Sequence, residues 1–176
     1  MALNTKRICI TAMGIALFVV LSLCLQVPVF ENYYLCLGYV VMTVFCYYYG
    51  PFSGAAVGSL GVVLYCLLTS GLRGMPGWAL GNLVIGIGVG AVCKLTDKMQ
   101  QRLLRHLLIG LSVVLCVGVA MLGVKSFVEC ILYTQPMLLR MAKNVYAFIA
   151  DTVVMIASLP ICVGLKEITN KSAAIK

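Results

Sequence analysis

The sequence predicts an all-α integral membrane protein, a compact bundle of six transmembrane helices with its N- and C-termini in the cytoplasm. Three observations lead to this class. Hydrophobic residues make up 62% of the 176 positions and charged residues only 10%, so a soluble domain of this size would lack polar surface. The apolar residues gather in runs of about 20, the length that crosses a bilayer. These runs lack the strict alternation of barrel strands.

The first apolar run is expected to be a retained helix rather than a signal peptide. It follows Lys6 and Arg7 and covers residues 8–27, which is longer than the roughly 7–15 residues of a signal-peptide core. No A-x-A cleavage site follows it. Pro28 then ends the helix, because proline lacks the N–H that would continue the backbone hydrogen bonding.

Turn residues separate the later helices. Residues 33–49 form a short second span, and the Gly50-Pro51 pair separates it from the third. The basic segment KLTDKMQQRLLRH at 94–106 joins the fourth span to the fifth. The expected spans of this single domain, residues 1–176, are 8–27, 33–49, 52–69, 77–95, 105–133 and 138–165.

The distribution of basic residues orients the bundle. Six spans leave both termini on one side, and the positive-inside rule assigns the side with more lysine and arginine to the cytoplasm. We therefore expect a multi-pass protein of the cell (plasma) membrane. The inner residues are Lys6, Arg7, Lys94, Lys98, Arg102, Arg105, Lys166, Lys171 and Lys176, and the fewer outer ones are Arg73, Lys125, Arg140 and Lys143.

Small residues spaced four apart mark helix faces that can approach another backbone closely. Two G-x-x-x-G pairs, in the third and fourth spans, are expected to pack within the bundle. Ala12 and Ala16 have the same spacing on the first helix. This alanine pair has two interpretations, packing within the bundle or a groove offered to another protein. The glycine pairs are Gly54 with Gly58 and Gly86 with Gly90.

Four polar residues in the last two spans need an explanation, because a charge at mid-bilayer costs roughly 2.5–3.5 kcal/mol on insertion scales. Lys125 and Glu129 lie one helical turn apart, and Asn144 and Asp151 lie two turns apart, so each pair shares a helix face. A short turn makes the two helices antiparallel and brings the pairs together toward the outer half of the membrane.

Two interpretations of these residues remain open. In one, Lys125 pairs with Glu129 or Asp151, and the charges hold the bundle together. In the other, the four residues line a polar pocket that opens to the outside and is closed by the aromatic loops at 29–34 and 72–78. Such a pocket would suit a small, flat, polar organic ligand.

Other chemistry is not indicated. The chain has no H-E-x-x-H, no G-x-S-x-G and no clustered carboxylates, and in its nearest phosphate-loop pattern, residues 118–126, Val124 is inserted before the lysine. The nine cysteines form no C-x-x-C pair, so we expect them to act as small apolar residues. We expect no enzyme activity, no cofactor, no metal and no nucleic-acid partner.

Several short motifs occur in an order that matches a known family. In chain order they are AMGIA at 12–16, YYLCLG at 33–38, YGPFSGA at 49–55, WALGN at 78–82 followed by Gly86 and Gly90, and Asn144, Asp151 and Leu159-Pro160 in the last span. Together they resemble the substrate-binding S components of energy-coupling factor (ECF) vitamin transporters, over nearly the whole chain. The chain departs from the family pattern at Tyr39, where an acidic residue is usual.

The resemblance implies a high-affinity capture subunit of an ECF-type importer. It would bind a water-soluble vitamin or related molecule, such as riboflavin, a thiamine precursor, a B6 vitamer or cobalamin. It would dock through Ala12 and Ala16 on a transmembrane coupling subunit that two ATPase subunits drive. A membrane scaffold or assembly subunit of similar size, which transports nothing, is the alternative. The implied ligand-binding residues are Asn32, Tyr33, Trp78, Asn82, Lys125, Glu129, Asn144 and Asp151.

Overall fold

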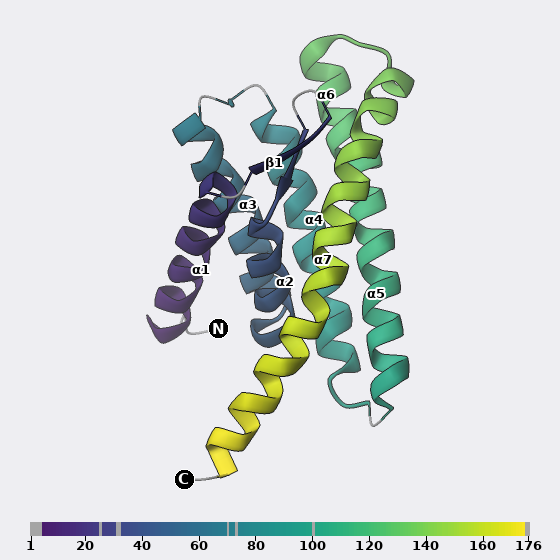
Figure 1. Ribbon diagram of the computed structural model, residues 1–176. Coiled ribbons are helices and arrows are strands. Elements are labelled where there is room, and N and C mark those ends of the chain that lie inside the picture. Colours follow the sequence, from purple (N-terminus) through teal and green to yellow (C-terminus); the bar gives the residue numbers. More distant parts are fainter. Residues whose placement is uncertain are drawn as a thin grey trace.

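Antiparallel helices account for most of the chain (Figure 1). The computed structural model describes residues 5–24, 26–30, 33–69, 71–72, 74–99 and 101–174, with side chains at all of these except 26–30, 33–35, 102, 167 and 169–174.

Five helical segments are long and apolar enough to cross a membrane: Thr5–Cys24, Pro51–Thr69, Met75–Thr96, Leu103–Tyr133 and Met137–Lys166. The chain is therefore a multi-pass helical membrane protein, as expected. Three of the helical elements, α5, η1 and α6, continue without a break and form one path through the bundle. The helices are α1 (Thr5–Cys24), α2 (Gly38–Tyr49), α3 (Pro51–Thr69), α4 (Met75–Thr96), α5 (Arg102–Gly118), the π-helix η1 (Val119–Lys125), α6 (Ser126–Tyr133) and α7 (Met137–Ala174).

The segment expected as the second span departs from the prediction. Its first residues form strand β2 (Tyr33–Cys36), which pairs antiparallel with β1 (Gln26–Phe30), and only α2 is helical. The 12 residues of α2 rise about 18 Å, well short of a hydrocarbon core of about 30 Å. Aromatic and β-branched residues on both sides of the turn favour strand pairing. A sixth full-length span is thus not confirmed, and the described chain is not purely helical.

The connections gather at the two ends of the bundle (Figure 1). The β1–β2 hairpin, the α3–α4 connection and the α6–α7 turn lie at one end, which we call the hairpin end. The α2–α3 turn and the α4–α5 connection lie at the opposite end, where α1 begins and α7 finishes. Gly50 makes the α2–α3 turn with a φ of 83°, a value that suits glycine because it lacks a Cβ atom.

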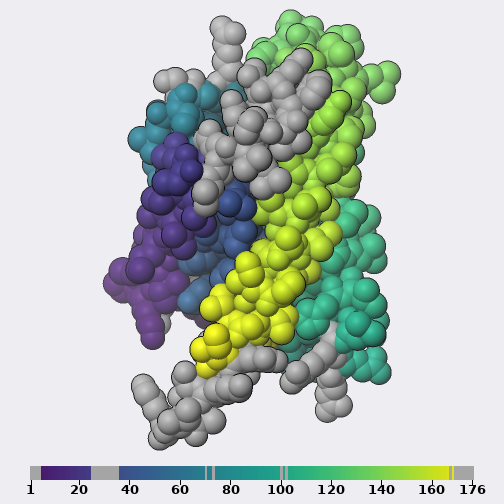
Figure 2. Space-filling view, viewed as in Figure 1, coloured from purple at the N-terminus to yellow at the C-terminus, as the bar shows by residue number. Residues whose placement is uncertain are grey.

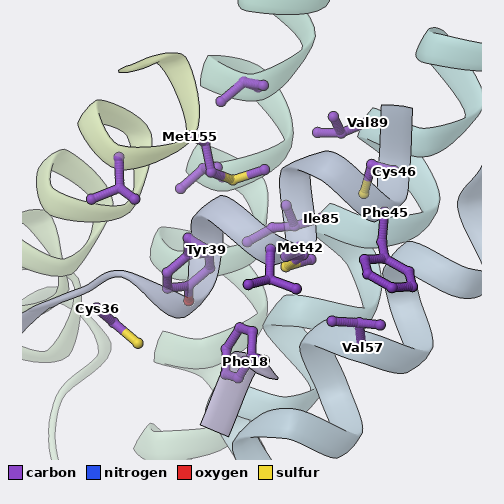
Figure 3. Close-up of a cluster of buried hydrophobic side chains, with 14 of the residues drawn as sticks. Phe18, Cys36, Tyr39, Met42, Phe45, Cys46, Val57, Ile85, Val89 and Met155 are labelled. Carbon is purple, nitrogen blue, oxygen red and sulfur yellow. The ribbon is translucent and has the colours of Figure 1, made fainter. Parts of the chain in front are cut away.

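Helix α2 lies at the centre of the bundle and contacts α1, α3, α4 and α7. Its buried side chains Tyr39, Met42 and Phe45 meet Phe18 of α1 and Ile85 of α4 in the cluster of Figure 3. The rings of Phe18 and Tyr39 pack edge to face with their centroids 6.1 Å apart. The short helix therefore supplies the core against which the longer helices pack.

Close approach of α2, α3 and α4 depends on glycine. A Cβ atom at Gly86 would collide with the backbone of Ala55, and one at Gly58 would lie 2.6 Å from the sulfur of Met42. Both glycine pairs therefore pack within the bundle, as expected. Their contacts are Gly54 with Cys46, Gly58 with Met42, Gly86 with Ala55, and Gly90 with Pro51.

Ionic contacts link the helices at the end opposite the hairpin. Asp97, just after α4, accepts hydrogen bonds from Arg105 of α5 at 3.1 Å and from Lys166 of α7 at 2.8 Å. The hydrogen bond from Lys166 lowers the pKa of Asp97. Both cations also lie over the ring of Tyr47 in α2. Exposed ion pairs contribute little individually, but this network connects α2, α4, α5 and α7.

Helix α1 forms one flank of the molecule (Figure 2) and packs on α2 and α3. Its buried residues include Gly14 and Phe18, while Ala12 and Ala16 are exposed. The alanine pair thus faces away from the bundle, so it is not used for packing within the described chain.

We expect Gly86→Ala to destabilise the protein by about 1–3 kcal/mol, because the added methyl group meets backbone atoms that cannot move aside. Thermal denaturation in detergent measures the effect. The matched control is Gly110→Ala on α5, where a Cβ atom meets nothing within 4 Å and the better helix propensity of alanine should keep stability equal or higher. Equal loss in both variants would contradict the packing role.

Candidate functional site

A cluster of polar side chains is buried toward the hairpin end of the bundle. Lys125 ends η1, Glu129 follows in α6, and Asn144 and Asp151 belong to α7. Their exposed fractions are 9%, 5%, 0% and 5%. Burial of two acidic groups and a basic group among apolar helices requires partners, since an isolated buried charge is costly.

Asn144 connects α7 to the helix opposite. Its Nδ2 donates hydrogen bonds to Ser126 Oγ and to Glu129 Oε2, both at 3.0 Å. The Ser126 hydroxyl in turn donates to the carbonyl oxygen of Met121 at 3.0 Å. Arg140, one turn before Asn144 on α7, places Nη1 3.9 Å from the same Glu129 oxygen. The Glu129 carboxylate therefore accepts a hydrogen bond from the Asn144 amide and pairs with the Arg140 guanidinium, and both partners belong to α7.

Lys125 is enclosed by three helices. Its side chain lies within electrostatic range of the carboxyl groups of Glu129 and Asp151, so its charge is balanced from both sides. Helix α4 approaches from a third direction, where a Cβ atom at Gly77 would lie 3.2 Å from the Lys125 carbonyl oxygen and 3.5 Å from Glu129 Cγ. A glycine at this point therefore lets α4 cover the cluster directly.

A second group of polar side chains joins α2, α3 and α4. Trp78 Nε1 donates to the hydroxyl of Tyr39 at 2.8 Å, and that hydroxyl donates to Asn82 Oδ1 at 2.8 Å. Asn82 Nδ2 donates to the carbonyl oxygen of Gly58 at 3.2 Å. Asp151 interacts electrostatically with the Tyr39 hydroxyl, so it connects this group to the charged cluster.

Arg140 retains hydrogen-bonding capacity. Its guanidinium lies over the ring of Tyr133 with Cζ 4.0 Å from the ring centroid, which fixes its plane beside Glu129. Its Nε is buried and has no hydrogen-bond partner among the described residues. Buried N–H groups are usually paired, so this one can donate to a further molecule that reaches the cluster.

The nine cysteines are distributed over the helices and β2. All are free thiols, and Cys36, Cys46, Cys66, Cys93 and Cys162 are buried. In the described part of the chain, histidine, cysteine and acidic side chains form no group of three that could hold a metal ion.

Comparison with known proteins identifies the family. The family model for the S component of ECF-type riboflavin transporters matches residues 2–167. The chain belongs to this family. A UPF0397 protein from Vibrio atlanticus (strain LGP32) is 31% identical over 140 residues, which cover 77% of this chain and 76% of that protein. The family is one of transporters rather than enzymes.

Most of the predicted site residues lie together in the structure. Lys125, Glu129, Asn144 and Asp151 form the charged cluster, and Trp78 and Asn82 form the neighbouring group with Tyr39. Two predicted residues cannot be placed in this way. Asn32 lies outside the described residues, and Tyr33 is described only as a backbone position in β2.

Sequence analysis did not name three residues of these polar groups, Tyr39, Ser126 and Arg140. Tyr39 was noted only as a departure from the family pattern, although a buried phenol usually has a hydrogen-bond partner. Ser126 follows Lys125 directly, and a hydroxyl at this place can bond a neighbouring carbonyl. Arg140 was counted as an outer basic residue and not among the expected ligand-binding residues.

We expect Tyr39→Phe to destabilise this S component by about 1–3 kcal/mol, because the indole N–H of Trp78 and the amide oxygen of Asn82 lose a buried partner. Trp78 is the only tryptophan, so its emission spectrum should shift as well. The control is Tyr49→Phe, since the exposed ring of Tyr49 packs on Phe45 and keeps that contact. An unchanged spectrum and melting temperature for Tyr39→Phe would refute the network.

Proposed function

We propose that this S component captures a small water-soluble organic molecule at the hairpin end, with riboflavin as the first candidate. The observation that carries the proposal is the buried cluster of Lys125, Glu129, Asn144 and Asp151. Ionisable residues inside a membrane bundle are costly and usually serve a ligand, an ion or a partner. The family description names riboflavin transporters, which makes riboflavin the first ligand to test.

The chemistry of the cluster suits a neutral ligand that both donates and accepts hydrogen bonds. Two basic side chains, Lys125 and Arg140, face two acidic ones, Glu129 and Asp151, so the formal charges balance. The buried Nε of Arg140 supports an acceptor on the ligand. Trp78 adds an aromatic face nearby, which suits a flat ring system.

The proposed orientation puts the hairpin end outside and both termini in the cytoplasm of a cell with this protein in its plasma membrane. The end opposite the hairpin carries more of the basic residues than the hairpin end, at the start of α1, around the α4–α5 connection and toward the end of α7, as the positive-inside rule requires of the cytoplasmic side. The ligand would then arrive from the outside, at the end where the polar cluster lies.

The proposed partners are a transmembrane coupling subunit and two ATPase subunits, which together form an ECF module. Ala12 and Ala16 are exposed on α1, and small side chains there allow a partner helix to approach closely. This chain would supply ligand recognition, and the module would supply the energy.

We expect the purified protein to bind riboflavin in a thermal-shift panel of vitamins, and Lys125→Ala and Asp151→Asn each to weaken binding about 10–100-fold. The reason is the loss of a charge-assisted contact worth about 1.5–3 kcal/mol. The control is Asp97→Asn, which alters the ionic network at the opposite end and should bind normally.

The same measurements separate capture from the two alternatives. If both cluster variants unfold while Asp97→Asn folds, the charges serve internal pairing instead. If the protein binds nothing in the panel and no small molecule co-purifies by mass spectrometry, a scaffold subunit is the better description.

We expect Ala12→Trp and Ala16→Trp to abolish pulldown of the coupling subunit from co-expressed membranes while ligand affinity stays within twofold. The indole would fill the space that a partner helix needs. Leu17→Trp is the control, because Leu17 is exposed on α1 about 100–140° around the helix from the alanines. Pulldown that is equal in all three variants would remove the docking role.

A further inference from the structure

A seven-residue π-helix interrupts the path from α5 to α6. It is η1, Val119–Lys125, and its last residue belongs to the charged cluster. π-helical turns are rare and are frequently found at functional sites. Because η1 ends where the polar residues begin, its geometry sets the direction in which their side chains point.

Six of the buried residues along this path recur every four positions. An ideal α-helix turns about 400° in four residues, so such a series drifts by about 40° at each step and by about 200° over five steps. Ile109 and Glu129 would then point to opposite sides of the helix. Both are nevertheless buried, and both α5 and α6 contact α4 and α7. The wider turn of η1 accommodates one extra residue, so it removes about 100° of this drift. The series is Ile109, Val113, Val117, Met121, Lys125 and Glu129.

Ser126 stabilises the end of the wide turn. Its backbone N–H donates to the carbonyl oxygen of Gly123, and its hydroxyl donates to the carbonyl oxygen of Met121, five positions earlier. The same hydroxyl accepts the hydrogen bond from Asn144. The carbonyl group of Met121 in η1 is thus connected through the Ser126 side chain to Asn144 of α7.

We propose that η1 is a positioning element that turns Lys125 and Glu129 toward α7 and thereby sets the geometry of the ligand site, with Ser126 as the positioning residue at its end. A regular α-helix with the same number of residues would rotate everything after it by about 100°. Lys125 would then leave the carboxyl groups that balance it. The consequence for ligand binding rests on the proposed capture function, whereas the rotation itself does not.

An alanine inserted between Val124 and Lys125 tests the rotation. It adds a residue that the single wide turn does not absorb, so Lys125 and Glu129 turn by about 100°, while every residue of the cluster is kept. Gly123→Ala is the matched control, since it keeps the residue count and a Cβ atom at this position meets nothing within 4 Å. A third variant combines the insertion with deletion of Gly123, which restores the residue count and the direction of Lys125 and Glu129.

Cysteine cross-linking reports the direction of Lys125 without any ligand. A Cβ atom at Gly77 would lie 3.4 Å from Lys125 Cγ, the position that a cysteine sulfur takes, so Gly77→Cys with Lys125→Cys has the spacing for a disulfide. Mass spectrometry of the linked peptide distinguishes this bond from bonds to native cysteines. We expect the link in the otherwise unchanged chain and with Gly123→Ala, at least a tenfold loss on insertion, and recovery in the compensated variant.

Riboflavin binding, measured without the added cysteines, should follow the same order of variants. An insertion variant that keeps the link, or binds riboflavin within twofold of the parent, overturns the proposal. If the insertion variant does not fold, the compensated variant decides, because recovery of fold and link supports the proposal and failure to recover overturns it. If the parent does not bind riboflavin, the capture function loses its first ligand, while the cross-linking series still decides the role of η1.

Discussion

Burial of charge among apolar helices is the constraint around which this S component is organised. Two basic and two acidic side chains lie between η1, α6 and α7, where an unpaired charge would cost several kcal/mol. Asn144 and Arg140 both reach Glu129 from α7. Both contacts require α7 to lie against the end of η1. This one requirement determines how the last two helical segments pack and in which direction Lys125 points.

Small residues meet a second requirement, the close approach of α4 to the charged cluster. Gly77 lies against Lys125, and a Cβ atom at Gly81 would lie 3.4 Å from the carbonyl oxygen of Ala120. Trp78 and Asn82 lie on the same stretch of α4 and bond Tyr39 of the central helix α2. Glycine spacing on one helix therefore places the aromatic and amide groups next to the charged ones.

Hydropathy predicted the long helices well, because lipid-facing runs are continuous and end at glycine or proline: residues 52–69 became Pro51–Thr69, and 77–95 became Met75–Thr96. It failed at residues 33–49, since an apolar run does not distinguish a strand followed by a short helix from one span. The convergence of the charged cluster followed from spacing alone. Tyr39 was missed because its partners, Trp78 and Asn82, come from a helix distant in sequence. The π-helix and the bond from Ser126 to the carbonyl five residues earlier were missed because helical spacing assumes a constant turn.

The β1–β2 hairpin carries backbone N–H and C=O groups that a helix would have paired within itself. A two-stranded ribbon pairs its N–H and C=O groups only along the shared edge, and an outer edge inside a membrane needs protein or water. Helix α7 packs on both strands and covers one side. The outer edge that α7 does not cover therefore needs water or another protein as its hydrogen-bond partner, so the hairpin is a place where the chain has to meet a polar medium.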